Sequence, residues 1–329
     1  MSIQWFPGHM AKTRKLMTDN LKLVDVAVEV LDARLPESSR NPLIHSLIGP
    51  KPRMLVLAKA DLAEEAYNKA WVAAFRKQGL TAVACNFKSA NPKEEIKKVT
   101  DGLRSRAEDI LARRQSRGIA NLTVRAMITG IPNAGKSTMI NLLAGRATTE
   151  TADRPGVTRG KQWIRLDRDL ELLDMPGILW PNLEDKEGAR KLAVTGAIGD
   201  NAYHQTELAL WLIGWLREHR PGRLTMRYGV KESLSDDEIA DFVSDGQIEN
   251  AAAWPLMEAE TEETAGEGGL SDTASWYILE AIGRRRGLLR KGGMVETDKA
   301  AIILLDELRG GKLGRITWDE PPADKEDGH

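Results

Sequence analysis

The chain has 329 residues, of which 42% are hydrophobic and 29% are charged, so its composition is that of a globular protein with about two domains. The formal net charge of −1 excludes a general attraction to nucleic acid, and any basic surface must be local. The single cysteine, Cys85, excludes an internal disulfide framework and is expected in the core. Neither a signal peptide nor a bilayer-spanning apolar run is visible, and we expect a cytoplasmic protein.

The first fifteen residues are rich in basic and aromatic side chains and contain no acid. Trp5 and Phe6 precede a Pro-Gly turn, after which residues 10–23 show helical spacing with a basic outer face. His9 therefore lies at the junction between the turn and the helix. A lone histidine is usually an ordinary surface residue, so a role for His9 needs a further argument.

Three short apolar runs, at residues 24–31, 54–57 and 81–86, predict buried parallel strands. Helices predicted at residues 64–78 and 94–118 alternate with them, which is typical of a parallel α/β sheet. Ligands of such sheets bind at the carboxyl ends of the strands. The polar loops expected on that side are Asp32-Ala33-Arg34, Ala58-Lys59-Ala60-Asp61 and Lys88-Ser89-Ala90.

A fourth predicted strand, at residues 122–129, leads into a phosphate-binding motif. The stretch GIPNAGKST at residues 130–138 fits the template G-x-x-x-x-G-K-[ST] and is followed by the apolar face of a helix. Backbone N–H groups of such a loop cradle phosphates, the lysine reaches the β and γ oxygens, and the serine ligates Mg²⁺. The predicted nucleotide contacts are Asn133, Ala134, Gly135, Lys136, Ser137 and Thr138.

Two further segments complete the predicted phosphate side. Residues 153–159 form a loop in which Thr158 can close over Mg²⁺ when a γ-phosphate is present. A hairpin at residues 162–173 then delivers Asp174, which suits a magnesium site, and the Pro-Gly turn that ends at Gly177. The predicted metal residues are therefore Ser137, Thr158 and Asp174.

The second half of the chain is predicted to be helical. Helical periodicity covers residues 186–198, 206–218, 236–243, 276–286 and 297–309. Residues 245–272 contain eight acids and no Lys or Arg, which indicates a mobile insertion. We expect two domains, at residues 1–182 and 183–329. The cluster Arg284-Arg285-Arg286 is the candidate RNA contact of the second domain, although a solvated helix end explains it as well.

The order of these elements is rotated relative to most small GTPases, in which the phosphate loop precedes the base-reading loops. With these residues in place, the chain resembles the YlqF-related, circularly permuted ribosome biogenesis GTPases over nearly its whole length outside residues 245–272. Permutation preserves the relation of each strand to its loop. The matching stretches are WFPGHM at residues 5–10, DAR at 32–34, GIPNAGKST at 130–138, DRPGVT at 153–158, DMPGILWP at 174–181, TGAI at 195–198 and GR at 314–315.

The resemblance implies an α/β fold: a circularly permuted P-loop GTPase domain with a mostly parallel sheet and helices on both faces, followed by a small all-α domain. It implies that a monomeric enzyme binds GTP or GDP with Mg²⁺ and promotes a late step in assembly of the large ribosomal subunit. RNA would be contacted by the N-terminal segment and the helical domain. The base would be read by Lys59, Asp61, Ser89 and Ala90, and the catalytic residues would be His9, Lys136 and Thr158.

Three positions qualify these expectations. Ala58 stands where the family has Asn, so guanine selectivity should be softened by the loss of hydrogen bonds of roughly 0.5–1.5 kcal/mol each. Ile178 follows Gly177 where many GTPases have a water-orienting Gln, which favours His9 as the catalytic group over a purely RNA-contacting one. Asn133 predicts activation by K⁺, although Asn is also common in such turns for conformational reasons.

Two other classes of protein remain open at this point. A metabolic P-loop kinase or ATPase would need an acceptor-binding lid and would not need Asp61. A nucleotide-dependent RNA-binding module with little hydrolysis would need only the basic N-terminal segment and the arginine cluster. Lys136, Ser137 and Asp174 favour hydrolysis over the second alternative.

Overall fold

The computed structural model describes residues 10–119, 123–145, 163–167, 169–175, 177, 185–235, 237–238, 240–241 and 268–322. These residues fall into two compact units. The sheet unit holds the described residues up to Leu192 together with those from Arg315 onward, and the helical unit holds those from Ala193 to Gly314. The two-domain division at residues 182 and 183 stays a prediction, and the return of the C-terminal segment to the sheet unit had no signal in the sequence.

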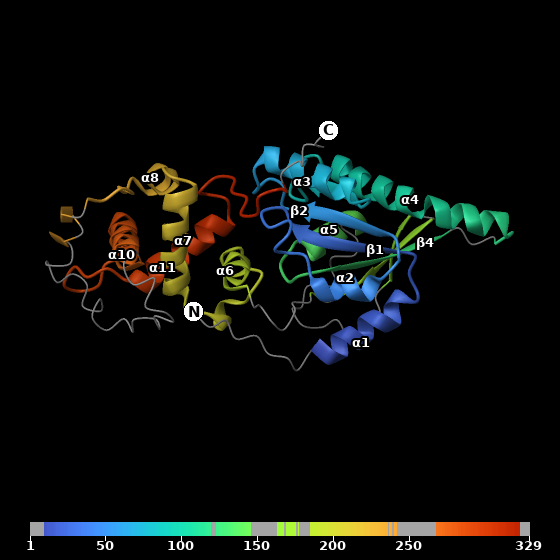
Figure 1. Ribbon diagram of the computed structural model, residues 1–329, viewed down its shortest axis with the longest axis horizontal. Helices are drawn as coiled ribbons and strands as arrows, with labels where there is room; N and C mark the ends of the chain where they lie inside the picture. The colour runs from blue at the N-terminus through green and yellow to red at the C-terminus, as the bar shows by residue number, and fades with distance from the viewer. Residues whose placement is uncertain are drawn as a thin grey trace, which may run out of the picture. The chain divides into compact units, whose positions relative to one another are not determined.

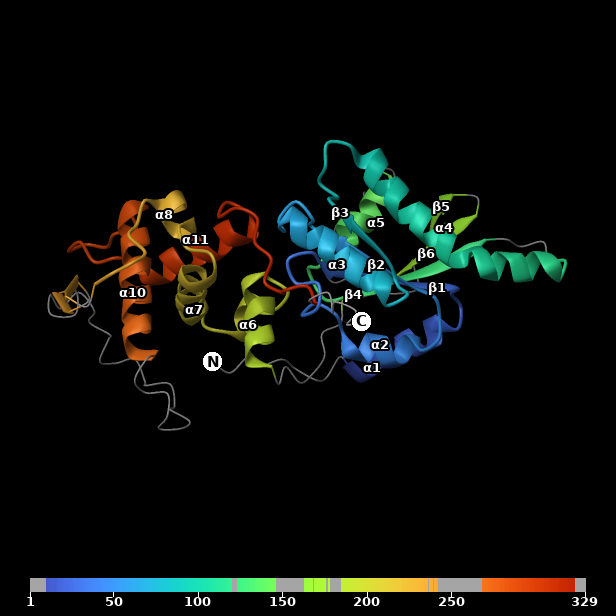
Figure 2. The same ribbon diagram turned by 45° about the horizontal axis from the view of Figure 1, so that its top comes forward.

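Six strands form one sheet, as Figures 1 and 2 show. The strand order is β3-β2-β1-β4-β6-β5, and every pairing is parallel except that of β5 with β6. The mostly parallel sheet predicted from the sequence is therefore confirmed. The strands are β1 (Val26–Asp32), β2 (Arg53–Ala58), β3 (Thr81–Cys85), β4 (Val124–Gly130), β5 (Trp163–Asp167) and β6 (Leu170–Asp174).

Helices cover both faces of the sheet (Figure 2). On one face lie α1 (Met10–Leu21), α2 (Pro42–Ile48) and α3 (Glu65–Lys77), and on the other α4 (Pro92–Ser116) and α5 (Lys136–Ala144). Residues 27 and 31 of β1 point to the first face, where they join buried side chains of α1, α2 and α3. Because β1 is buried along its whole length, the centre of the sheet forms the core.

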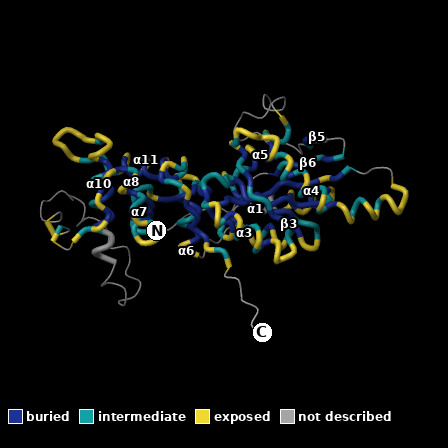
Figure 3. The backbone as a smooth tube through the Cα atoms, turned by 90° about the horizontal axis from the view of Figure 1, so that it is seen from above, coloured by how far each residue is buried: buried dark blue, intermediate teal, exposed yellow. Residues whose placement is uncertain are grey.

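Only the first two thirds of the long helix α4 bury side chains against the sheet. Its buried residues Val99, Leu103 and Ala107 lie in the first two thirds, and its C-terminal part is mainly exposed (Figure 3). The close approach to the sheet needs Gly102, where an added Cβ would come within 2.5 Å of the Met54 side chain. The exposed end, which carries Glu108, Asp109 and Arg113, agrees with a solvated helix face.

Helix α2 was not predicted because seven residues are too short to show helical periodicity. Its local signals are nevertheless present: the Asn41 side chain accepts a hydrogen bond from Leu43 N at the N-cap, and Pro42 occupies the first helical position. A capping residue followed by proline could have revealed this helix.

The helical unit is built from α7 (Gln205–His219), α8 (Arg223–Tyr228), α10 (Gly268–Arg285) and α11 (Thr297–Arg309), with a short 3-10 turn at Asp200–Ala202. Its core consists of apolar side chains from α7, α10 and α11, among them Leu208, Leu212, Ile213, Leu216, Ile278, Leu279, Ile282, Leu304 and Leu305. Within the described residues, no helix is long and apolar enough to cross a membrane.

Two predicted boundaries in this half of the chain were wrong. Helix α10 begins at Gly268, so residues 268–272 are helical rather than part of a mobile insertion, since no proline interrupts the helix. Residues 245–267 lie outside the described residues. Helix α6 (Lys186–Val194) ends four residues before the predicted end, because the chain turns at Gly196, whose φ is +80°.

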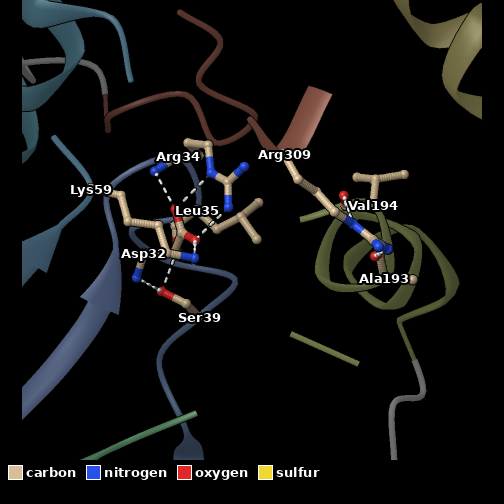
Figure 4. A network of polar contacts seen from close by, with 8 residues as sticks. All are labelled: Asp32, Arg34, Leu35, Ser39, Lys59, Ala193, Val194 and Arg309. Atoms are coloured by element: carbon tan, nitrogen blue, oxygen red, sulfur yellow. Dashed lines mark hydrogen bonds and ion pairs between the residues drawn. The ribbon is translucent and has the colours of Figure 1, made fainter. Parts of the chain in front are cut away.

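Arg309 closes the turn after α6, as the right half of Figure 4 shows. Its guanidinium donates to the carbonyl oxygens of Val194 and Ala193 at 3.1 and 3.0 Å and to the Tyr203 hydroxyl at 2.7 Å. A Cβ at Gly196 would lie 3.3 Å from Arg309 Nε. The sequence TGAI at residues 195–198 thus forms a turn that fits this arginine.

Candidate nucleotide-binding site

The parallel strands bring five polar segments to one edge of the sheet. At this carboxyl edge β1 ends at Asp32, β2 at Ala58, β3 at Cys85, β4 at Gly130 and β6 at Asp174. The loops that follow β2, β3 and β4 contain the predicted base-reading residues and the start of the phosphate loop, and Asp174 itself ends β6 at this edge. The structure therefore gathers on one side the segments that the sequence spreads over more than a hundred residues.

The phosphate loop has a conformation that only glycine tolerates at two points. Gly130 has a φ of +144°, and a Cβ there would lie 2.3 Å from the Val30 carbonyl oxygen. Gly135, at the N-cap of α5, has a φ of +111°. Asn133 also adopts a positive φ, +55°, which Asn accepts more readily than most residues. The loop is thus pressed against β1 with its turn at the start of α5.

Lys136 lies under this loop with only 8% of its surface exposed. Its Nζ donates to the carbonyl oxygens of Ile131 at 2.7 Å and Gly130 at 3.3 Å. Burial lowers the pKa of Lys136 to about 8, and the nearby Asp174 carboxylate opposes this shift. A buried ammonium that donates to neutral carbonyl oxygens and feels the charge of Asp174 is well placed to accept an anionic partner.

Asp174 and Gly177 complete the phosphate side. Burial raises the pKa of Asp174, and the charge of Lys136 acts in the opposite direction. A Cβ at Gly177 would lie 2.8 Å from Lys136 Nζ and 2.9 Å from Pro132 N. The turn after β6 therefore touches the phosphate loop directly, and the structure brings Lys136, Asp174 and Gly177 together.

The remaining predicted phosphate and metal residues divide into three groups. Ser137, Thr138 and Asn133 are exposed, whereas Ala134 is buried. The hydroxyl of Ser137 and the carboxylate of Asp174 are hard oxygen donors of the kind that Mg²⁺ takes alongside phosphates and water. His9 and Thr158 lie outside the described residues. No group of three or more His, Cys, Asp or Glu that could hold a metal ion occurs in the described part of the chain.

The base side of the edge is organised around Asp32, shown in the left half of Figure 4. Arg34 donates to both carboxylate oxygens of Asp32, at 2.9 and 2.7 Å, and Lys59 Nζ donates to Oδ2 at 2.9 Å. Burial alone would raise the pKa of Asp32, but the two cations hold it well below its usual range. Asp32 is therefore a charged anchor for Lys59, a role that sequence reasoning missed.

The loop after β2 is held at several points and leaves Asp61 available. Lys59 has a φ of +58°, Ala60 N donates to Cys85 O at 3.1 Å, and Asn68 Nδ2 donates to Ala60 O at 2.9 Å. Asp61 is half-buried, and no hydrogen bond or ion pair to its carboxylate occurs among the described residues. A fixed backbone with an unengaged carboxylate suits recognition of a donor-rich base edge.

Ser89 and Ala90 lie in the turn after β3, next to the same edge. Ser89 N donates to Asn86 O at 3.0 Å, and its hydroxyl accepts from Asn91 N at 3.1 Å. Ser89 is half-buried and Ala90 is exposed. Their backbone can therefore reach a ligand in this edge.

Ala58 is fully buried and faces the phosphate loop. Its Cβ lies 3.0 Å from the position of a Cβ on Gly135. An asparagine at position 58 would thus direct its amide toward the phosphate loop. In this chain the contact between the two loops is apolar.

Helix α1 packs beside the start of the turn that follows β6 and ends at Gly177, here called the switch turn. Met17 and Leu21 share a buried cluster with Leu173 and Met175, and Asn20 Nδ2 lies 3.3 Å from Met175 Sδ. In Figure 1, α1 runs antiparallel to β1, so the N-terminal end of α1 lies on the side of the carboxyl edge. Helix α1 therefore packs next to Met175, the residue that follows Asp174.

The glycine-rich loop, the buried Lys136 and the D-x-x-G turn define a P-loop nucleoside-triphosphate hydrolase. The predicted base-reading loop follows β2 and so comes before the phosphate loop in the chain, the element order of the circularly permuted GTPase class.

Comparison with known proteins agrees with this class. The profile of the family described as 50S ribosome-binding GTPase matches residues 125–240, which begin at β4. Ribosome biogenesis GTPase A of Bacillus cereus is 40% identical over 98% of this chain and 95% of its own length. Mitochondrial ribosome-associated GTPase 1 of Bos taurus is 36% identical over 71% of each chain. GDP-bound YlqF of Thermotoga maritima superposes with a TM-score of 0.58 at 25% identity, covering 93% of this chain and 99% of that one.

The chain belongs to the ribosome biogenesis GTPase A family and is a GTP hydrolase. The metabolic kinase and ATPase alternative is thereby excluded, and the fold class predicted from the sequence is confirmed.

Proposed function

We propose that this GTPase binds the precursor of the large ribosomal subunit, promotes a late step of its assembly, and hydrolyses GTP to GDP and phosphate there. The observation that carries the proposal is the joint placement of Lys136, Asp174, Gly177 and Asp61 at one sheet edge. The names of the relatives support the ribosome as the partner. We further propose that the protein acts as a cytoplasmic monomer.

In this proposal each side of the site has its own task. Asp61 accepts hydrogen bonds from the guanine base, the Lys59 stem lies against the base, and Ser89 and Ala90 close the base side. The phosphate loop from Asn133 to Thr138 and Gly177 holds the phosphates. Mg²⁺ held by Ser137, Thr158 and Asp174 would neutralise phosphate charge. Lys136 supplies a second positive charge where negative charge develops.

We propose His9 as the residue that orients the attacking water. The support is the packing of α1 along β1. Its twelve residues span about 18 Å, and its N-terminal end lies on the side of the nucleotide edge. Met10, the first residue of α1, directly follows His9 in the chain. An imidazole can orient water by hydrogen bonding and has an ordinary pKa near neutrality.

The variant His9→Ala tests this role. GTP and subunit affinity should stay nearly unchanged while turnover stimulated by the subunit falls by about 10²-fold, the lower end expected for a positioned acid-base group. A variant that loses subunit affinity but keeps its intrinsic turnover would make His9 a docking residue.

We propose that K⁺ stimulates hydrolysis through Asn133. The left-handed, exposed Asn133 stands at the rim of the phosphate loop, where a monovalent cation can offset developing charge. Turnover should be higher in K⁺ than in Na⁺ at matched ionic strength with subunits present. Equal turnover in the two salts would remove this proposal.

The RNA contact of the helical unit needs revision in the light of its ion pairs. Arg284 pairs with Glu280 at 2.6 Å, and Arg286 donates to both carboxylate oxygens of Glu307 at 2.7 and 2.8 Å. The predicted cluster is thus largely engaged within the unit. Arg290 and Lys291 are exposed, with no side-chain partner among the described residues, and we propose these two as the phosphate contacts.

Subunit binding in different nucleotide states tests the proposed function. The affinity for the large-subunit precursor should be higher with a non-hydrolysable GTP analogue than with GDP, because a γ-phosphate orders the switch turn that leads into the helical unit. Added subunits should also raise phosphate release. Nucleotide-dependent binding without phosphate release would instead support the RNA-binding module, and equal affinity in both states would contradict the switch.

A further inference from the structure

The C-terminal segment Arg315–Glu320, here called the strap, returns to the sheet unit after the helical unit ends at Gly314. The strap is extended and has two backbone hydrogen bonds to the nucleotide-side loops. Ile316 N donates to Leu62 O at 3.0 Å, and Trp318 N donates to Arg34 O at 2.8 Å. Both side chains, Ile316 and Trp318, are buried. The strap therefore bridges the loops that follow β2 and β1.

Thr317 fixes the strap to the start of α3. Its hydroxyl accepts from Glu64 N at 3.0 Å, and its own N–H donates to Glu64 Oε2 at 3.2 Å. Glu64 is the N-cap of α3, and its own side chain makes no cap hydrogen bond to the helix. The reciprocal pair thus satisfies backbone groups at a helix end that begins three residues after Asp61.

Asp319 fixes the strap to the loop after β1. Its carboxylate accepts from Glu37 N at 2.9 Å, from Ser38 N at 2.7 Å and from the Ser38 hydroxyl at 2.7 Å. The carboxylate is 7% exposed, and the carbonyl oxygen of Asp319 accepts from Trp71 Nε1 at 3.1 Å. A buried charge with three donors is costly to displace.

The strap touches neighbours of both base-reading residues. Leu62, whose carbonyl oxygen it engages, directly follows Asp61. Arg34, whose carbonyl oxygen it also engages, holds the Asp32 carboxylate that binds Lys59 (Figure 4). Asp61 is thus one residue away from a strap contact, and Lys59 is linked to the strap through two ion pairs, Lys59–Asp32 and Asp32–Arg34.

We propose that the strap is a positioning element of the base site, which fixes Lys59 and Asp61 for guanine from a segment more than 250 residues away in the chain. This proposal rests on the assignment of Lys59 and Asp61 to the base. The strap hydrogen bonds given above go to the loops that follow β1 and β2 and to α3, and none of them goes to the phosphate loop. Its influence should therefore fall on base selectivity and leave phosphate affinity alone.

The test uses the full chain with the double substitution Thr317→Val and Asp319→Ala. Valine keeps the shape of threonine and removes the acceptor for Glu64 N, and alanine removes the acceptor of the 37–38 turn. Affinities are measured for GDP, for IDP, which lacks the exocyclic amine of guanine, and for ADP. We expect GDP affinity to fall roughly tenfold, about one or two hydrogen-bond contributions, while the preference for GDP over IDP shrinks and ADP affinity stays constant.

Glu320→Gln is the matched control. The exposed Glu320 directly follows Asp319 and accepts a hydrogen bond from the Tyr67 hydroxyl at 3.1 Å, so an amide at this position should leave all three affinities unchanged. Thr317→Ser, which keeps the hydroxyl, should retain the wild-type GDP preference that Thr317→Val reduces. If the double variant does not fold, the preference for GDP over IDP is compared between Thr317→Ser and Thr317→Val instead. A lower preference in the valine variant alone supports the proposal, and equal preferences contradict it.

An equal loss of affinity for GDP, IDP and ADP would overturn the proposal, because a purely structural role weakens every nucleotide alike. An unchanged GDP preference in a folded variant would also overturn it. Asp61→Asn is measured in parallel: if it alters base preference while the strap variants do not, only the strap proposal fails. If Asp61→Asn also changes nothing, the base-site assignment itself is wrong and the strap proposal falls with it.

Discussion

The two sides of the nucleotide edge are built in different ways. The phosphate side is compact in sequence: Lys136 is held by carbonyl oxygens five and six residues earlier, and the loop conformation depends on its own glycines. The base side is assembled from distant segments, since Asp32, Lys59 and the strap residue Asp319 all contribute. From outside, the phosphate loop is approached closely by Val30 of β1, by Ala58 and by the turn at Gly177.

This difference predicts which residues control phosphate affinity and which control base selectivity. If the proposed site is right, phosphate affinity depends on a short local segment, and single substitutions there should have large effects that all nucleotides share. Base selectivity would then depend on several tertiary contacts, and substitutions there should have smaller effects that depend on the base.

Lys136→Ala should give the largest loss. Removing the buried ammonium leaves nucleotide phosphates without their closest positive charge, and the affinity for GTP, GDP and ATP should fall by about 10²–10³-fold. Equilibrium titration with each nucleotide measures these affinities. Lys231→Ala, which removes an exposed lysine of the helical unit paired with Glu238, is a control with little expected change. A loss confined to guanine nucleotides would break the proposed separation.

Gly177→Ala should weaken GTP more than GDP. The new Cβ would lie 2.8 Å from Lys136 Nζ, in the region where a γ-phosphate meets the lysine, and the clash should cost roughly 1–3 kcal/mol. The affinity for a non-hydrolysable GTP analogue should therefore fall about tenfold while GDP affinity changes less. Equal losses for both nucleotides would show that the turn does not sense the γ-phosphate.

Nucleotide affinity should fall as the pH rises above 8. The pKa of Lys136 is lowered to about 8, so its charged form dominates below that value and is lost above it. Between pH 7 and pH 9 the charged fraction falls from about 0.9 to about 0.1, and affinity should drop by about tenfold. Lys136→Arg, whose guanidinium stays charged, should bind with a flatter pH profile. A flat profile in the wild type would assign the phosphate charge to another group.

Ala58→Asn should give the smallest effect, a gain. The amide would face Gly135 and could restore a tie between the base and phosphate loops, worth roughly 0.5–1.5 kcal/mol, or about a two- to tenfold gain in GDP affinity. Ala58→Leu has similar volume without the amide and separates hydrogen bonding from crowding in this buried position. If both variants lose affinity equally, the position admits no larger side chain.

The contrast also explains how much of the molecule the sequence predicted. The phosphate loop follows from nine consecutive residues, and α11 was predicted with its observed bounds because its apolar spacing is regular. The strands of the sheet were found for the same reason. The strap had no such signal: an extended segment without periodicity reveals its partners only after folding, so its contacts with Glu64 and Ser38 were invisible.

Asp32 illustrates the same limit within the site. Its place after a buried strand marked it as a functional loop residue, but the ion pairs with Arg34 and Lys59 depend on the register that sets Asp32 beside Ala58. Strand register is a property of the assembled sheet. The buried cysteine was simpler, since the apolar run around Cys85 was enough to predict its place in the core.

The most direct test of the account is the nucleotide preference of Asp61→Asn. The wild type should bind GDP in preference to ADP and to xanthosine diphosphate, because the carboxylate accepts from the donors on the guanine edge. The asparagine variant should lose GDP affinity and gain affinity for xanthosine diphosphate, whose edge carries an oxygen where guanine has an amine, while ADP affinity stays constant. A variant with unchanged GDP affinity would contradict the account, since the base would then be read elsewhere than at the end of β2.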